Sequence, residues 1–144
     1  MEFEKTRSAG YLANHMARLF ANRLAAEIDI LGLAPAQFMT LLELWERDGL
    51  TQAELIDRLD VEQATLANTL SRMDRDGLIK RTTHPNDKRA KLIWLTQKSR
   101  DLEVDAKASA AKINHQALKG LNEAEIRLFL KLAQRVVTSL RHHE

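Results

Sequence analysis

Three basic side chains and one carboxylate crowd into a five-residue stretch of this 144-residue chain. Residues 72–91 carry seven basic and three acidic side chains, whereas residues 1–71 carry six basic and eleven acidic ones. A local excess of cations on a chain of formal charge +2 is suited to contact with a phosphate backbone. Taken alone, such a run is more often a solvated turn. The group consists of Asp87, Lys88, Arg89 and Lys91.

A second group of polar side chains comes about twenty residues earlier, in the segment QATLANTLSRM. If this segment is helical, Leu66, Leu70 and Met73 form one apolar stripe and the polar residues lie away from it. Asn and Gln can pair bidentately with adenine, and Arg can reach guanine or phosphate. Taken alone, the pattern also fits a solvated helix face. The polar group consists of Gln63, Thr65, Asn68, Thr69 and Arg72.

Asp87 is the unexpected member of the basic group, because phosphate repels a carboxylate. It stands two residues before Arg89 in a predicted tight turn. There it can accept hydrogen bonds from turn amides and orient the guanidinium through a charge-assisted contact. An arginine oriented in this way gains from the negative potential of a narrow A·T-rich minor groove.

The elements that must position the two groups are predicted to be mostly helical. Five glycines and two prolines, in a chain rich in Leu, Ala, Glu, Lys and Arg, favour helices over a β-sandwich or barrel. Thr51 with Glu54 and Asn122 with Glu125 form capping boxes, and Thr96 can cap a further helix. Apolar periodicity then predicts helices over residues 8–31, 35–47, 51–59, 61–77, 97–119 and from residue 123 onward.

Two short strands are predicted between the fourth and fifth helices, over residues 78–82 and 91–95, with a hairpin tip at 84–89. The expected fold is therefore mainly α with a small antiparallel β-hairpin wing, the winged form of the helix-turn-helix. In that arrangement the second helix of the motif enters the major groove of DNA, and the hairpin tip reaches an adjacent groove or the backbone.

The segment from Leu50 to Thr96 resembles the DNA-binding half of the MarR (multiple antibiotic resistance regulator) family. The family's wing carries an Asp-x-Arg signature followed by a strand and a threonine, matched here by Asp87-Lys88-Arg89 and then LIWLT. The preceding LAPAQFMTLLELWERDGLTQAELIDRLDVEQATLANTLSRMDRDGLIKR is similar through its proline-started helix and its Asp-Gly-Leu-Ile exit into the wing. The resemblance covers about residues 10–140.

The resemblance implies a homodimeric transcription regulator, usually a repressor, that binds an inverted-repeat operator in double-stranded DNA. Such regulators are often released by small aromatic or phenolic ligands. We accordingly expect one MarR-like domain over residues 1–144, with a winged-helix DNA-binding lobe at 33–96 and a helical dimerisation region at 8–31 and 97–142. A winged-helix adaptor that binds another protein through the same polar helix face is the alternative.

The chain departs from the family pattern where the recognition helix begins. The family usually has Ser or Thr at this position, and this chain has Glu62. Asp60 could cap the helix instead, or Glu62 could help to select bases by accepting a hydrogen bond from cytosine.

The last predicted helix is apolar over more than one face, which indicates an oligomer interface. We expect this interface to include the first helix and the alanine-rich stretch Ala106 to Ala111, where small side chains allow close packing. A two-fold dimer would also place two recognition helices one DNA turn apart. A monomeric helical core is the alternative. The apolar residues are Leu128, Phe129, Leu130, Leu132, Val136, Val137 and Leu140.

A ligand site is expected only from the resemblance, because ligands in the family often lie between the dimer helices and the DNA-binding lobe. Here that region would include His15, Arg18 and Trp45, together with Tyr11 and Phe38. A cationic or titratable group among aromatic rings could hold an aromatic carboxylate. His15 and Trp45 are, however, more often core or hydrogen-bonded residues.

Catalysis, metal binding and a cofactor find little support in the sequence. The five histidines show no metal-ligand spacing within one helix, and neither a Gly-rich phosphate loop nor a nucleophile elbow is present. The absence of cysteine excludes disulfides and thiolate metal sites. No apolar run reaches the roughly 18 residues of a membrane span, and MEFEKTRS lacks a signal-peptide core, so we expect a cytoplasmic protein without membrane contact.

Overall fold

The computed structural model of the protein describes residues 2–142. The chain divides into two compact units, Met1–Ala110 and Ala111–Glu144, and the boundary falls inside the long helix α5. Unit 1 contains both groups of residues singled out above, the polar helix and the basic hairpin.

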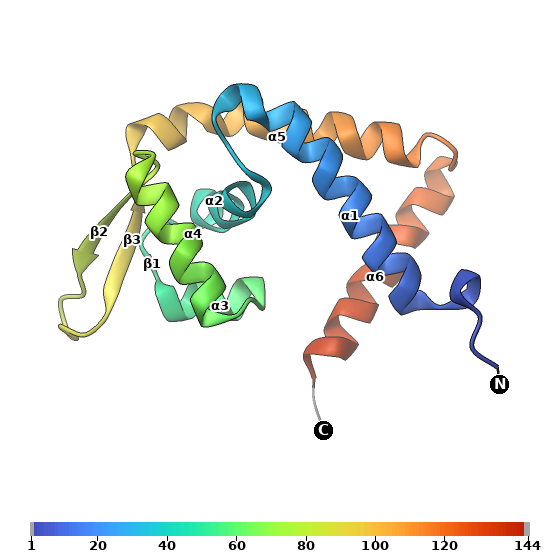
Figure 1. Ribbon diagram of the computed structural model, residues 1–144, viewed down its shortest axis with the longest axis horizontal. Helices are drawn as coiled ribbons and strands as arrows, with labels where there is room; N and C mark the ends of the chain where they lie inside the picture. The colour runs from blue at the N-terminus through green and yellow to red at the C-terminus, as the bar shows by residue number, and fades with distance from the viewer. Residues whose placement is uncertain (1, 143–144) are drawn as a thin grey trace. The chain divides into compact units, whose positions relative to one another are not determined.

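Helices form most of the described chain, and one small sheet interrupts them (Figure 1). The mainly α architecture with a β wing is therefore confirmed. The predicted first helix is α1 followed by a single 3-10 turn, η2. The elements are η1 (Lys5–Arg7), α1 (Ala9–Ile28), η2 (Asp29–Leu31), α2 (Pro35–Glu46), β1 (Leu50–Thr51), α3 (Gln52–Leu59), α4 (Gln63–Arg75), β2 (Ile79–Thr83), β3 (Lys91–Leu95), α5 (Gln97–Leu118) and α6 (Glu123–Arg141).

Three of the side-chain caps at helix starts are those predicted from the sequence. At α3 the Thr51 hydroxyl accepts from the Glu54 amide, and the Glu54 carboxylate accepts from the Thr51 amide, both at 3.1 Å. Asn122 and Glu125 form the same reciprocal pair at α6. At α5 the Thr96 hydroxyl accepts from the amide of Ser99 at 3.3 Å. These predicted caps are confirmed, because capping depends only on residues within one turn.

The sheet has three antiparallel strands in the order β1-β3-β2. Leu50 of β1 pairs with Ile93, and Ile79 of β2 pairs with Leu95. The sequence predicted only the hairpin and missed β1. A strand of two residues carries no alternation to detect, and it forms here through pairing with a segment 43 positions away in the chain.

The core of unit 1 lies between α2, α3, α4 and the sheet. Leu41 and Leu44 of α2 and Leu55 of α3 are fully buried. From α4, Leu70 and Met73 are also fully buried, and Leu66 is nearly so. Burying such a side chain stabilises the fold by about 1.5–3 kcal/mol. The predicted apolar stripe of α4 is thus confirmed, and it decides which side of this helix faces solvent.

α1 and α6 keep many apolar side chains in contact with solvent. Ile28 is the one fully buried residue of α1, and α6 has no buried residue within its bounds. The exposed apolar residues of these two helices are Tyr11, Leu12, Met16, Leu19, Leu128, Leu130, Leu132, Val136, Val137 and Leu140.

No helix of residues 2–142 taken singly has the length and apolar composition of a membrane span. The segments Ala9–Leu31 and Pro35–Glu46 reach that composition only as a pair, and they are bent by 76° at the break between them.

Candidate nucleic-acid interface

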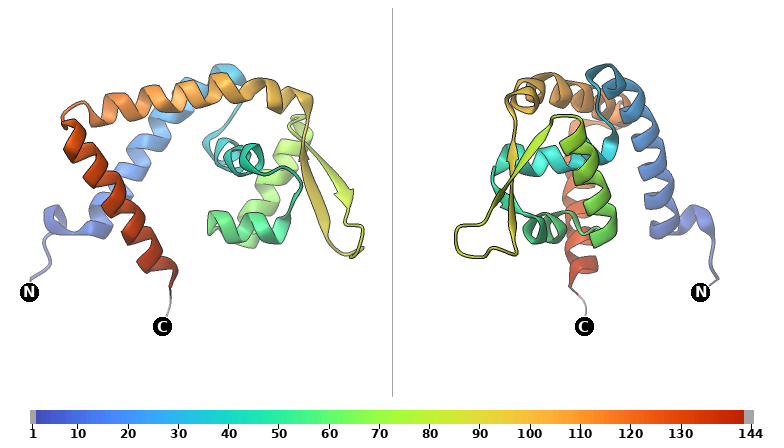
Figure 2. Two further views of the ribbon diagram at one scale, coloured as in Figure 1. Left: turned by 180° about the vertical axis from the view of Figure 1, so that it is seen from behind. Right: turned by 60° about the vertical axis from the view of Figure 1, so that its left-hand side comes forward.

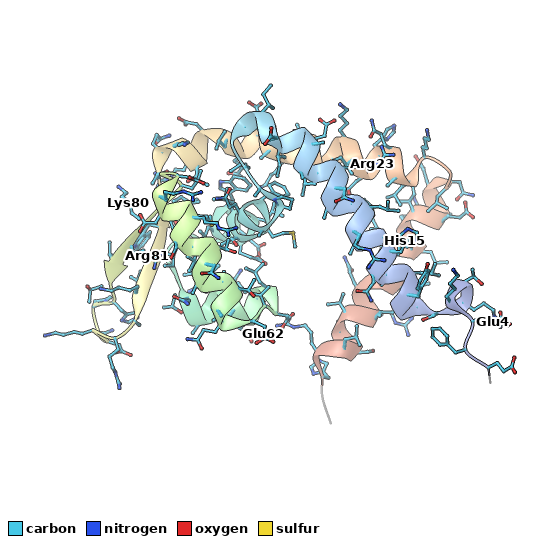
Figure 3. All side chains as sticks on the ribbon, viewed as in Figure 1. Glu4, His15, Arg23, Glu62, Lys80 and Arg81 are labelled. Carbon is cyan, nitrogen blue, oxygen red and sulfur yellow. The ribbon has the colours of Figure 1, made fainter. Side chains whose placement is uncertain are left out.

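A tight turn joins α3 to α4. Asp60 ends α3 in the left-handed region, with φ of 53°, and its amide donates to the carbonyl of Ile56 at 2.9 Å. Glu62 is the N-cap residue of α4, and its side chain makes no capping hydrogen bond. Glu62, rather than Asp60, therefore stands at the start of α4, and its side chain is exposed there (Figure 3).

The outer face of α4 is polar and exposed. Gln63, Thr65, Asn68 and Arg72 all lie in solvent. Within residues 2–142 none of these four side chains forms a hydrogen bond or an ion pair with another residue. Since the apolar stripe of α4 is held in the core, the four side chains form one outward-facing surface, which we call the α4 polar face.

Thr69 is placed differently from the prediction. Its side chain is buried, and its hydroxyl donates to the carbonyl of Thr65 at 3.0 Å. The reason is helical geometry, because Thr69 lies three residues after Leu66 and four before Met73, on the edge of the apolar stripe. The prediction that Thr69 shares the outer face is wrong.

The wing tip holds Arg89 in a turn closed by Asp87. The Asp87 carbonyl accepts from the amide of Ala90 at 3.1 Å, and Asp87 Oδ1 accepts from the amide of Arg89 at 3.0 Å. Arg89 Nε lies 3.5 Å from the same carboxylate oxygen, and the arginine side chain is 95% exposed. The contact expected between Asp87 and Arg89 is present. Lys88, between them, is exposed.

His84 closes the other side of the tip. Its Nδ1 accepts from the amide of Asn86 at 3.0 Å, and its own amide donates to the carbonyl of Ala90 at 3.1 Å. The tip is therefore a hydrogen-bonded turn with three cations, at positions 88, 89 and 91, on its surface. Figure 2 shows this hairpin projecting from the helices of the same unit.

Two further cations lie on strand β2, and one of them, Arg81, lies beside α4. Lys80 and Arg81 are exposed there (Figure 3). Arg81 Nε is 3.6 Å from Asp74 Oδ2 at the end of α4, so this pair links the wing to the helix. Both residues belong to the basic stretch 72–91, but the sequence predicted no role for them. Their signal in the sequence was the run of polar residues that follows Ile79 in β2.

Asp76 joins three helices just behind the wing. Its carboxylate accepts from Arg75 Nε at 3.0 Å and from Gln37 Nε2 of α2 at 3.0 Å. Lys98 Nζ of α5 donates to its carbonyl at 2.8 Å. The hydrogen bond from Arg75, followed by that from Gln37, holds the pKa of the Asp76 carboxyl below its usual value. The junction fixes the end of α4 against α2 and the start of α5.

The three predicted ligand residues lie in different surroundings. His15 and Arg18 are exposed on α1, and His15 meets the ring of Tyr11 edge-on at 6.0 Å. Trp45 of α2 is half-buried, and its Nε1 donates to the carbonyl of Ser99 at 3.0 Å. Among the described residues, no hydrogen bond or ring contact joins Trp45 to either α1 residue. The structure does not bring the three into direct contact.

Residues 33–91 match the model of the MarR family. They include α2, the α3–turn–α4 motif, the whole of β2 and the wing tip. This segment is a MarR-family domain. The assignment agrees with the resemblance seen in the sequence, and it rests on the residues that carry the α4 polar face and the Asp87–Arg89 pair.

Proteins similar to this chain include transcriptional regulators. Transcriptional regulator HosA of Escherichia coli O111:H- is 28% identical over 107 residues, which are 74% of this chain and 79% of HosA. A MarR-family transcriptional regulator from Listeria monocytogenes, crystallised with a 26mer DNA, superposes with a TM-score of 0.87 at 27% identity, covering 94% and 90% of the two chains. A probable transcriptional regulator from Pseudomonas aeruginosa superposes with a TM-score of 0.84 at 28% identity, covering 92% and 99%.

Proposed function

We propose that this MarR-family protein is a cytoplasmic, homodimeric regulator of transcription that binds an inverted-repeat operator in double-stranded DNA. We further propose that it acts as a repressor and that a small aromatic or phenolic ligand releases it. The observation that carries the proposal is the α4 polar face, a row of exposed hydrogen-bonding side chains without partners among residues 2–142, next to a wing with an oriented arginine.

The α4 polar face has the chemistry of base recognition. An α-helix fits the major groove of B-DNA, and residues at its N-terminal end contact base edges. Gln63 and Thr65 lie in the first turn of α4, and Asn68 follows one turn later. We assign Gln63, Thr65 and Asn68 to base contacts and Arg72, a further turn along, to phosphate or guanine. Thr69 is left out because its hydroxyl is already bonded.

The wing supplies cations for the backbone and the minor groove. Asp87 fixes the direction of the Arg89 side chain, which is otherwise free in solvent. We propose that Arg89 enters a minor groove beside the recognition site and that Lys88 contacts phosphate. Arg81, on β2 beside the end of α4, extends the same cationic surface along the path of a phosphate backbone.

A second copy of the chain would cover the exposed apolar residues of α1 and α6. On α6 the residues Leu128, Leu132, Val136 and Leu140 follow one another at four-residue spacing and are all exposed. Covering such side chains gains about 1.5–3 kcal/mol for each one fully buried. We propose that residues 8–31 and 97–142 form the dimerisation region and residues 33–96 the DNA-binding lobe.

The effector part of the proposal is supported by one face of α1. Tyr11, His15 and Arg18 lie four and three residues apart, so a ring, a titratable ring and a guanidinium are neighbours on this face. These groups suit an aromatic carboxylate. Trp45 is proposed as a ring surface only, because its N–H already donates to Ser99.

Selection of bound sequences from a random duplex pool tests the proposal. A palindromic consensus is expected, because a two-fold dimer reads two equivalent half-sites. Fluorescence anisotropy on the selected duplex should then show affinity falling by several decades between low and moderate salt, as about 6–10 phosphates are contacted. Benzoate and phenol should release the duplex, and cyclohexanecarboxylate should not. Failure to enrich any duplex, with salt-independent binding to a protein partner, would favour the adaptor.

A further inference from the structure

The outer face of the sheet carries one aromatic side chain, Trp94. It lies in β3, the central strand, directly opposite Lys80 of β2. Its neighbours Ile93 and Leu95 are buried in the core. Since side chains alternate along a strand, Trp94 projects from the opposite face of the sheet.

The indole of Trp94 reaches both edges of this sheet. On one side Trp94 Nε1 donates to the Thr82 hydroxyl of β2 at 2.8 Å. On the other side its six-membered ring lies against Gly49, which immediately precedes β1. A methyl group added to Gly49 would lie 2.6 Å from Cη2 of Trp94. Glycine is therefore required there by close approach as well as by its φ of +74°. We call Gly49, Thr82 and Trp94 the indole clasp.

The clasp spans the three-stranded part of the sheet, next to the two-stranded tip. Thr82 stands opposite Leu92, in the last row that includes β1, and Gly49 precedes β1 at its end away from the tip. β1 pairs with Leu92 and Ile93 and goes no further. Beyond that point Thr83 pairs with Lys91, and only the turn from His84 to Ala90 follows. A two-stranded hairpin is only marginally stable in water. The direction in which it points must therefore be fixed by the three-stranded part of the sheet, where the indole ties Thr82 of β2 to Gly49 across β3.

We propose that Trp94 is a positioning residue, and that the indole clasp sets the direction in which the wing presents Arg89 to DNA. The inference rests on the proposed DNA-binding function and adds residues that the interface itself does not contain. A wing without the clasp would sample several directions, and ordering it on the duplex would reduce affinity.

Removing the hydrogen bond tests the clasp without removing the ring. Thr82→Val deletes the acceptor, and Trp94→Phe deletes the donor while retaining an aromatic ring. Each should weaken binding to the selected duplex by roughly three- to tenfold, the range expected for one hydrogen bond. Thr82→Ser retains the hydroxyl and should bind as the unaltered protein does. Thr6→Val, which removes an exposed threonine hydroxyl in η1 outside the wing, is the control and should change binding little.

Two readouts separate positioning from a general loss of stability. In an Arg89→Ala background, Thr82→Val should have no further effect on affinity, because a clasp acting through Arg89 has nothing left to position. In the free protein, hydrogen exchange at the amides of His84 and Ala90 should become faster in Thr82→Val, while the amides of α4 keep their protection.

The outcomes distinguish the clasp from the function on which it rests. If the unaltered protein enriches no duplex, the proposed function is overturned, and with it the role of the clasp in DNA binding. If the unaltered protein binds and Thr82→Val binds equally well, only the clasp is overturned. If Thr82→Val lowers the affinity for the duplex equally in the unaltered protein and in Arg89→Ala, the proposal is also overturned, because the clasp then does not act through Arg89.

Discussion

One carboxylate oxygen of Asp87 contacts both the backbone and the side chain of Arg89. Oδ1 accepts from the Arg89 amide at 3.0 Å and lies 3.5 Å from Nε of the same residue. The arginine side chain is 95% exposed, so the ion pair adds at most about 1 kcal/mol to stability. The effect of the ion pair is therefore geometric, because the same Asp87 oxygen closes the turn and contacts the Arg89 guanidinium.

Arg89→Ala should weaken binding to the selected duplex by about 1–3 kcal/mol, roughly 5- to 150-fold, because a groove contact is lost. Fluorescence anisotropy at fixed salt measures this loss. Lys88→Ala is the control, since it also removes one exposed cation from the tip. Its effect should be uniform across duplex sequences, with the salt slope reduced by about 1. If the unaltered protein, Arg89→Ala and Lys88→Ala all prefer the same duplex sequences to the same degree, Arg89 does not contribute to sequence recognition.

Asp87→Asn and Asp87→Ala should weaken binding to different extents. Asn keeps an oxygen that can accept from the Arg89 amide but has no charge to align the guanidinium, whereas Ala loses both contacts. We expect the order of affinity to be Asp, then Asn, then Ala, each step about threefold or more. Titration of each variant with the same labelled duplex gives the order. If either variant binds the duplex more tightly, repulsion between the Asp87 carboxylate and phosphate outweighs the benefit of orienting Arg89.

Asn68→Ala should relax base preference at one position in each half-site and cost about 1–3 kcal/mol of binding there. Selection from a random pool, repeated with the variant, shows which position loses its preference. Thr69→Val is the matched control, because this neighbouring residue is buried and points to the core. A shift of consensus with Thr69→Val and none with Asn68→Ala would contradict the assigned orientation of α4.

Val136→Asp should dissociate the dimer. The residue is 52% exposed, and a second copy that covers it would have to bury a carboxylate. Sedimentation equilibrium should show a monomer with unchanged helical circular dichroism, and operator affinity should fall because one half-site contact is lost. Thr138→Asp places the same charge elsewhere on α6 and should leave the dimer intact. Dissociation by both variants, or by neither, would move the interface away from Val136.

Asp76→Asn should destabilise the fold at pH 6 and much less at pH 3. The hydrogen bonds from Arg75 and Gln37 hold the Asp76 pKa below its usual 3.8 in the folded protein. A lowered pKa contributes stability that is fully present above 3.8 and is lost as pH falls through the folded value. Urea unfolding at the two pH values measures the difference. Asp105→Asn, which also removes one carboxylate, on α5, is the control variant. A pH-independent penalty for Asp76→Asn would show that the charge is not involved.

Much of the fold could be predicted because the deciding signals are local. Thr51 with Glu54 and Asn122 with Glu125 act within one turn, and both capping boxes form as expected. The apolar stripe of α4 follows from its 3.6-residue period. The edge of that stripe is less certain from spacing alone, which is why Thr69 was assigned to the wrong face.

The contacts that the sequence did not predict join distant segments. β1 forms only because Leu50 meets Ile93, and Asp76 meets Gln37 across 39 positions. Trp94 was predicted as a strand residue, but its position between Gly49 and Thr82 depends on the order of all three strands.

By itself, the sequence determined the helices, their caps, the basic hairpin and the polar composition of α4, since these depend on neighbours a few residues apart. Only the tertiary structure decided which α4 side chains reach solvent and how the wing is tied to the body. The physical reason is that burial and strand pairing depend on where distant parts of the chain meet.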